Sequence, residues 1–90
     1  MKVYIITYCW SNEMAGHDDG VLDVFLDLNQ ATKKFNEMVK EEAKSFKEDV
    51  CAGVEVRETA QTNEDGSRYV YYGNDLGEFY SASLHVSEPH

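Results

Sequence analysis

The sequence predicts one α+β domain in which an amphipathic helix packs on one face of a mostly antiparallel sheet, in the order ββαβββ. Apolar residues recur at helical spacing over residues 28–48. On either side of this stretch lie short segments rich in β-branched and aromatic residues, separated by glycine-containing turns. One long helix among short strands is typical of an α+β fold. The length of 90 residues suits one domain, which we expect over residues 1–88, with 89–90 as a frayed tail.

Two strands are expected before the helix. Residues 2–10 are rich in β-branched and aromatic types, and both alternating sets of side chains are largely apolar, which favours a central strand covered on both faces. Residues 11–20 are polar and end in Asp-Gly, a turn signal, so we expect them to form a loop. Residues 21–26 then read as a short second strand that can pair with the first as a hairpin.

The helix is expected to begin after Asp27, a residue type that caps helix N-termini, and to end near residue 48, before Gly53. Its apolar residues fall in one arc about 140° wide, as expected of a helix that lies on a sheet. Lysine and glutamate residues occupy the opposite side. The members of the apolar arc are Leu28, Ala31, Phe35, Met38, Val39, Ala43 and Phe46.

Three strands are expected after the helix. Residues 54–58 alternate between apolar and charged types, and residues 68–72 form an aromatic segment that follows a glycine-containing turn at 63–66. A second such turn at 73–77 precedes the last strand, over residues 79–86. A single helix can cover only one face of the resulting sheet, so the other face is left without one.

The charge of the chain is unevenly distributed. The formal net charge is −9. The helical segment has five lysines against four glutamates, a net of +1, while the remainder has three basic residues against thirteen acidic ones, a net of −10. Such a surface opposes binding to phosphate backbones, because counterion release needs lysine and arginine. No apolar run approaches the roughly 18 residues that a membrane span needs. We therefore expect no direct nucleic-acid binding and no membrane association.

Most of the aromatic residues lie on three predicted strands rather than on the helix. Strand alternation sends some of these rings to the sheet face that the helix leaves uncovered, and tyrosine and tryptophan are common anchors of protein interfaces. The rings can form a contact face for another protein or a second copy, or they can be ordinary residues of a partly wet sheet. The candidate interaction face comprises Tyr4, Tyr8, Trp10, Tyr69, Tyr71 and Phe79.

Glu42 is the candidate buried acid. On a helical wheel it falls inside the apolar arc, where the helix should meet the sheet. A carboxylate in that position must find a partner or become neutral. It could then act as a general base, or pair with Arg57 or a tyrosine hydroxyl. The alternative is an acid near the end of the stripe that reaches water.

The sequence gives no positive support for catalysis. Residues 17–19, His-Asp-Asp, are metal-ligand types, but three adjacent loop residues cannot all point at one ion, which favours a solvated turn. His85 shares a strand face with Ser81 and Ser83, without an assignable orienting acid. The sequence contains no glycine-rich phosphate loop, nucleophile elbow or zinc motif. We therefore expect a protein that is not an enzyme, with no catalytic residue, no metal and no cofactor.

The two cysteines bear on the cellular compartment. Cys9 and Cys51 can form at most one disulfide, and neither belongs to a CxxC pair. Because the sequence shows no secretion signal, we expect two free thiols in a reducing compartment, and hence a cytoplasmic protein.

Three segments of the first half of the chain form a recognisable pattern. Lys2-Val3-Tyr4-Ile5-Ile6-Thr7 is followed by Val24-Phe25-Leu26-Asp27 and then by Ala31-Thr32-Lys33-Lys34-Phe35. This order resembles a pattern found in small uncharacterised phage and prophage proteins, in which a VYVVT-type first strand precedes a second strand ending in VF and an acid- and lysine-rich helix. The resemblance implies a bacterial or phage setting and carries no functional residues across.

Three functions are compatible with these features. The first is a small protein–protein interaction module that works as a homodimer or as an accessory subunit. The second is an acidic inhibitor that imitates nucleic acid and blocks a basic site on a host or defence protein, and it requires carboxylates aligned on one surface. The third is a small ligand-binding domain or enzyme that uses Glu42, His85 or the loop around His17, and it requires a pocket.

Overall fold

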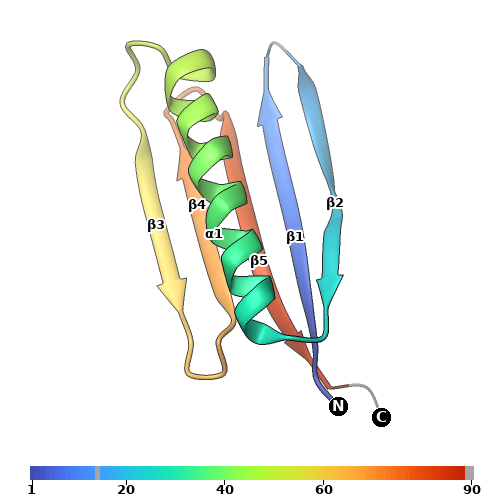
Figure 1. Cartoon of the computed structure of the whole chain (residues 1–90). Helices are drawn as coiled ribbons and strands as arrows, with labels where there is room; N and C mark the ends of the chain where they lie inside the picture. The colour runs from blue at the N-terminus through green and yellow to red at the C-terminus, as the bar shows by residue number, and fades with distance from the viewer. Residues whose placement is uncertain (14, 89–90) are drawn as a thin grey trace.

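The structure is a computed structural model that describes residues 1–13 and 15–88, so the tail predicted at 89–90 lies outside the described residues. It confirms the α+β fold, with one helix packed against a five-stranded antiparallel sheet (Figure 1). The elements are β1 (Val3–Asn12), β2 (Gly16–Phe25), α1 (Leu28–Ser45), the π-helical turn η1 (Phe46–Val50), β3 (Arg57–Thr62), β4 (Arg68–Gly73) and β5 (Phe79–Ser87).

The first and last strands lie side by side inside the sheet. The strand order is β2-β1-β5-β4-β3, and every neighbouring pair is antiparallel. β1 therefore has a neighbouring strand on both sides, which confirms the predicted central position. The helix covers only one of its faces (Figure 1), so the expectation that both faces are covered is wrong. The two edges of the sheet are β2 and β3, each the outer strand of a hairpin.

The predicted loop over residues 11–20 is largely strand, and this prediction was wrong. β1 continues to Asn12 and β2 already begins at Gly16, with Trp10 opposite Asp18 in the register. The residues of the first half of β2 are exposed. An edge strand with exposed side chains needs no apolar alternation, because the backbone ladder with β1 holds it in place. For this reason its polar sequence looks like a loop.

The helix agrees closely with the prediction. Asp27 caps it, since its Oδ1 accepts a hydrogen bond of 2.9 Å from the backbone N–H of Asn29. The α-helical hydrogen bonds continue to Ser45, and the chain then widens into η1, where the Cys51 N–H donates to the Phe46 carbonyl at 2.9 Å. In the part of the chain that the structure describes, no helix combines the length and apolar character needed to cross a bilayer.

The core lies between the helix and the central strands. α1 lies over the middle of the sheet, roughly along the direction of β5 (Figure 1), and buries Ala31, Phe35 and Ala43. Burial of a phenylalanine side chain of this kind contributes about 1.5–3 kcal/mol to stability. The sheet supplies the other half of the core, and the buried apolar residues outside α1 are Ile6, Phe46, Cys51, Tyr72, Tyr80, Ala82 and Leu84.

The third strand differs from the predicted 54–58. β3 spans Arg57–Thr62, and its side chains are all exposed. The turn at 63–67 sets the register, because the Asn63 N–H donates to the Ser67 carbonyl at 2.9 Å and places Thr62 opposite Arg68. Val56 packs against the core from outside the strand. The apolar alternation that suggested a strand therefore belongs to the connection that precedes it.

Candidate functional site

The helix covers one face of the sheet, and the opposite face is called the open face here. Side chains alternate between faces along a strand, and the buried Ile6 and Leu84 mark the helix side. The register then places on the open face Val3, Ile5, Thr7, Cys9 and Ser11 of β1, His17, Asp19, Val21 and Val24 of β2, Arg57, Thr59 and Gln61 of β3, Tyr69, Tyr71 and Gly73 of β4, and Phe79, Ser81, Ser83, His85 and Ser87 of β5.

The open face is almost free of charge. Its three inner strands, β1, β5 and β4, are fully described and present no aspartate, glutamate, lysine or arginine there. Charged side chains occur on the two edge strands, as Asp19 on β2 and Arg57 on β3. In a chain with a net charge of −9, this depletion separates the open face from the rest of the surface.

Apolar and aromatic side chains are exposed on the open face. Val21 is 61% exposed, Val24 is 52% exposed and Tyr69 is 41% exposed. The rings of Tyr71 and Phe79 stack with centroids 5.9 Å apart and an interplanar angle of 17°. The Tyr71 ring also covers Gly73, where an added Cβ would lie 2.7 Å from the Tyr71 hydroxyl oxygen. The Tyr71 ring therefore packs both on Gly73 and against Phe79 on the open face.

The six residues of the predicted interaction face lie on two faces rather than one. Tyr69, Tyr71 and Phe79 are on the open face. The other three, Tyr4, Tyr8 and Trp10, are on the helix side, where Tyr4 and Trp10 pack against the core. The register causes this division. Tyr80 lies opposite Trp10 on β1 and opposite Tyr72 on β4, so Tyr71, the next residue along β4, points to the other face.

Glu42 is exposed, so the buried-acid prediction is wrong and the alternative, an acid that reaches water, agrees with the structure. Its position inside the apolar arc of the helix therefore does not determine its burial. The buried acid of the described chain is Glu78, which is 8% exposed. Glu78 follows the turn at 74–77 and comes directly before β5. No local pattern marked it, because its burial depends on contacts with distant parts of the chain.

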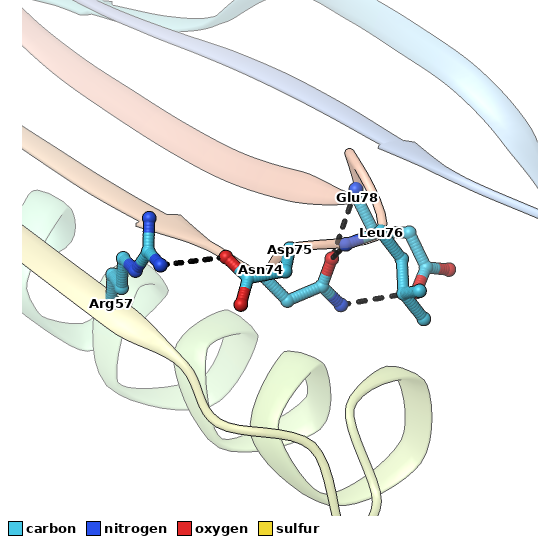
Figure 2. Close-up of polar contacts among 5 residues, drawn as sticks. All are labelled: Arg57, Asn74, Asp75, Leu76 and Glu78. Atoms are coloured by element: carbon cyan, nitrogen blue, oxygen red, sulfur yellow. Dashed lines mark hydrogen bonds and ion pairs between the residues drawn. The ribbon is translucent and has the colours of Figure 1, made fainter.

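The Glu78 carboxylate is held by a network at the turn between β4 and β5. Figure 2 shows Asn74 at its centre, with Oδ1 accepting from the backbone N–H groups of Leu76 at 3.0 Å and Glu78 at 3.1 Å. The Asn74 Nδ2 donates to Glu78 Oε1 at 3.1 Å. Glu78 Oε2 accepts from the backbone N–H of Glu13, in the turn between β1 and β2, at 3.2 Å. The network therefore ties two distant turns together.

Tyr80 holds a hydroxyl group in an unusual environment on the helix side. The residue is 3% exposed, and its hydroxyl has no hydrogen-bond partner among the described residues. Burial, and after it the nearby charge of Glu42 and the neighbouring Tyr72, raise the pKa of Tyr80 well above that of an exposed tyrosine. The hydroxyl therefore stays protonated at neutral pH, shielded from water and without a partner among the described residues.

The two histidine-containing groups singled out in the sequence lie apart from further metal-ligand or serine partners in the described part of the chain. In β2, alternation turns His17 and Asp19 to the open face and Asp18 to the helix side, so residues 17–19 cannot surround one ion. The described residues contain no group of three or more His, Cys, Asp or Glu placed to hold a metal. His85 Nε2 is hydrogen-bonded to the Thr7 hydroxyl at 2.9 Å rather than to Ser81 or Ser83.

Comparisons with protein-family models, with curated proteins and with solved structures found no significant match to this chain.

Proposed function

We propose that this chain is a small protein–protein interaction module that pairs with a second copy of itself through the open face. The observation that carries the proposal is the absence of charge from the inner strands of that face, combined with the exposed Val21, Val24 and Tyr69. Depletion of charged residues and enrichment in aromatic ones are the compositional features of interface centres.

The size of the open face suits a dimer contact. Strands lie about 4.8 Å apart and rise about 3.3 Å per residue. Three strands of nine or ten residues and two of six therefore present roughly 650 Å² of projected area per copy. A standard interface buries about 800 Å² of accessible surface per partner, and side-chain relief makes accessible area larger than projected area. Face-to-face packing of two sheets is a common way to bury such a surface.

The charge distribution also favours this arrangement. Two copies with a net charge of −9 each repel at long range, so a stable contact has to keep carboxylates out of its centre. A two-fold axis along β5 would lay the β2 edge of one copy over the β3 edge of the other. Asp19 and Arg57, in neighbouring rows of the register, would then meet across the rim as opposite charges.

Sedimentation equilibrium tests the proposal. We expect the wild-type chain to form a dimer that persists in high salt, because the contact is apolar at its centre. Val24→Glu and Tyr69→Glu each place a carboxylate on the open face at an exposed position, and each should weaken the dimer by at least about tenfold. Gln30→Glu adds the same charge to an exposed position of α1 and serves as the matched control.

Two results would overturn the proposal. One is a wild-type chain that stays monomeric at every concentration measured. The other is a dimer that Gln30→Glu weakens as much as Val24→Glu does, since the effect would then come from net charge and not from the open face. A folded far-UV spectrum for each variant separates loss of pairing from loss of structure.

A further inference from the structure

A cavity of about 230 Å³ lies on the helix side of the sheet, between α1 and the β1–β2 hairpin. The register explains why it forms. Tyr8 lies between Gly20 on β2 and Ala82 on β5, two residues with little or no side chain. Of these three neighbouring residues only Tyr8 has a large side chain, which leaves space beside its ring on the helix side of the sheet. The cavity is roughly one and a half times the size of an apolar cavity of about 150 Å³ that takes a benzene molecule.

Three aromatic rings line this cavity, from Tyr8, Trp10 and Tyr80. Leu22 of β2 and Met38 of α1 complete the apolar part of the wall. The electron-rich faces of tryptophan and tyrosine attract cations, and aromatic groups of this kind bind organic ammonium ions in proteins. The wall therefore accepts an apolar body and favours a positive charge next to it.

The charged side chains that line the cavity are both acidic, Asp18 of β2 and Glu42 of α1. Asp18 is oriented by Tyr8, whose hydroxyl donates to Asp18 Oδ2 at 2.9 Å. Both carboxylates are on exposed residues, so they lie at the rim, where a ligand enters from water. An anion would be repelled, and two carboxylates among apolar groups do not supply the six or more oxygen ligands that a calcium ion takes.

Tyr80 completes the aromatic wall of the cavity. The residue is 3% exposed, its side chain lines the cavity, and its hydroxyl has no partner among the described residues. Because the hydroxyl oxygen is shielded from water, it lies behind the wall and does not contact a ligand in the cavity. Tyr80 therefore contributes its ring, and not its hydroxyl, to the site.

We infer that this cavity binds an organic cation, an ammonium group carried on a compact apolar body. The aromatic rings and Met38 hold the body, and Asp18 and Glu42 attract the charge. The same chemistry can be presented by a free amine or by a lysine side chain of another protein. The site lies on the opposite side of the sheet from the open face, so it does not depend on self-association.

Fluorescence of Trp10 provides a direct test, because it is the one tryptophan of the chain and lines the cavity. The full-length protein is titrated with cyclohexylammonium, with cyclohexanol as a neutral probe of similar shape and with cyclohexanecarboxylate as the anion. We expect a saturable change with cyclohexylammonium, binding at least about tenfold weaker for cyclohexanol, and no saturable change with the anion. Nα-acetyl-lysine methylamide distinguishes the two sources: tighter binding than cyclohexylammonium indicates a protein side chain, and weaker binding indicates a free amine.

Glu42→Gln removes one rim charge with little change of shape and should weaken cyclohexylammonium binding by about tenfold, leaving cyclohexanol unchanged. Glu48→Gln is the matched control, since it removes the same charge from an exposed residue that lines a separate recess beside Tyr72 and not this cavity. Tyr80→Phe keeps the ring that lines the cavity and should leave cyclohexylammonium binding unchanged, because the hydroxyl is shielded from the cavity.

The inference is overturned if cyclohexylammonium gives no saturable change, or if cyclohexanol binds equally well. It is also overturned if Glu48→Gln weakens binding as much as Glu42→Gln, because the cation would then respond only to the overall acidity of the protein. If the chain does not pair through the open face but still binds cyclohexylammonium, the proposed function is rejected and the inference about the cavity is not affected.

Discussion

Asn74 binds the Glu78 carboxylate and the Glu78 backbone at the same time, through Nδ2 to Oε1 and through Oδ1 from the N–H, both at 3.1 Å. One amide side chain therefore closes the turn between β4 and β5 and provides a partner for the buried acid of the fold. The same Nδ2 also lies 3.1 Å from the Cys51 sulfur, which links the turn to the end of η1. Loss of Asn74 would therefore disturb the turn between β4 and β5, the end of η1 and, through Glu78, the turn between β1 and β2.

Asn74→Ala should lower the free energy of unfolding by about 2–4 kcal/mol, because it removes the turn contacts and leaves Glu78 buried without its amide partner. Asp75→Ala, in the same turn, is the control. Asp75 contacts Arg57 at 2.7 Å in an exposed ion pair, and loss of such a pair costs at most about 1 kcal/mol. Urea unfolding measures both values. Equal losses for the two variants would show that the Glu78 network contributes no special stability.

Gly66 and Leu28 offer a second local test. Gly66 has φ +91°, and an added Cβ would lie 2.8 Å from Leu28 Cδ2, at the start of α1. Gly77 has φ +83° with no atom near such a Cβ. Gly77→Ala should therefore cost about 1–2 kcal/mol from backbone strain alone, and Gly66→Ala should cost about 1 kcal/mol more, because Leu28 must leave its rotamer. In a Leu28→Ala background the two glycine substitutions should cost the same. An unchanged difference would exclude Leu28 as its cause.

The helix and the order of the elements could be predicted because their signals are local. The apolar arc of α1 and the cap at Asp27 lie within one segment, and both agree with the structure. The edge strands could not be predicted with the same accuracy. β3 and the first half of β2 expose their side chains, so their sequences lack the apolar alternation that identifies a half-buried strand. Backbone pairing with an inner strand, which is a long-range property, is what makes them strands.

The candidate sites show the same limit more strongly. Alternation within a strand correctly groups Tyr69 with Tyr71, but the pairing of separate strands decides which face each group occupies. Tyr8 and Trp10, which the sequence assigned to the contact face, therefore line the helix-side cavity instead. Glu78 gave no signal at all, because one of its partners, the Glu13 N–H, lies 65 residues away in the chain. Side-chain chemistry was visible in the sequence, and its assembly into sites was not.

The two buried tyrosines of the helix side predict a pH effect. Tyr72 donates to Glu58 Oε1 at 3.2 Å, and burial, with the charge and hydrogen bond of Glu58, raises its pKa. The pKa of Tyr80 is raised as well. An unfolded tyrosine ionises near pH 10. Above about pH 10 the unfolded chain therefore loses protons that the folded chain keeps, and stability should fall as the pH rises further.

Tyr72→Phe and Tyr80→Phe should change the free energy of unfolding differently at neutral pH and in the same direction at high pH. At neutral pH, Tyr72→Phe should cost about 0.5–1.5 kcal/mol because it loses the bond to Glu58, while Tyr80→Phe should be neutral or stabilising because its hydroxyl has no partner. Each variant should reduce the loss of stability between about pH 8 and pH 10.5. Urea unfolding at the two pH values measures this, and a wild-type stability that does not fall in base would contradict the assignment.

The two free cysteines provide a chemical probe of the proposed dimer. Cys9 is half-buried on the open face, and Cys51 is buried in the core beside Asn74. In dilute protein, iodoacetamide should modify Cys9 much faster than Cys51, because a core thiol reacts only when the fold opens. As the protein concentration rises through the dimer range, the Cys9 rate should fall while the Cys51 rate stays constant. In Val24→Glu the Cys9 rate should stay high at every concentration. Cys9 modification that is independent of concentration in a protein known to be dimeric would place the contact elsewhere than on the open face.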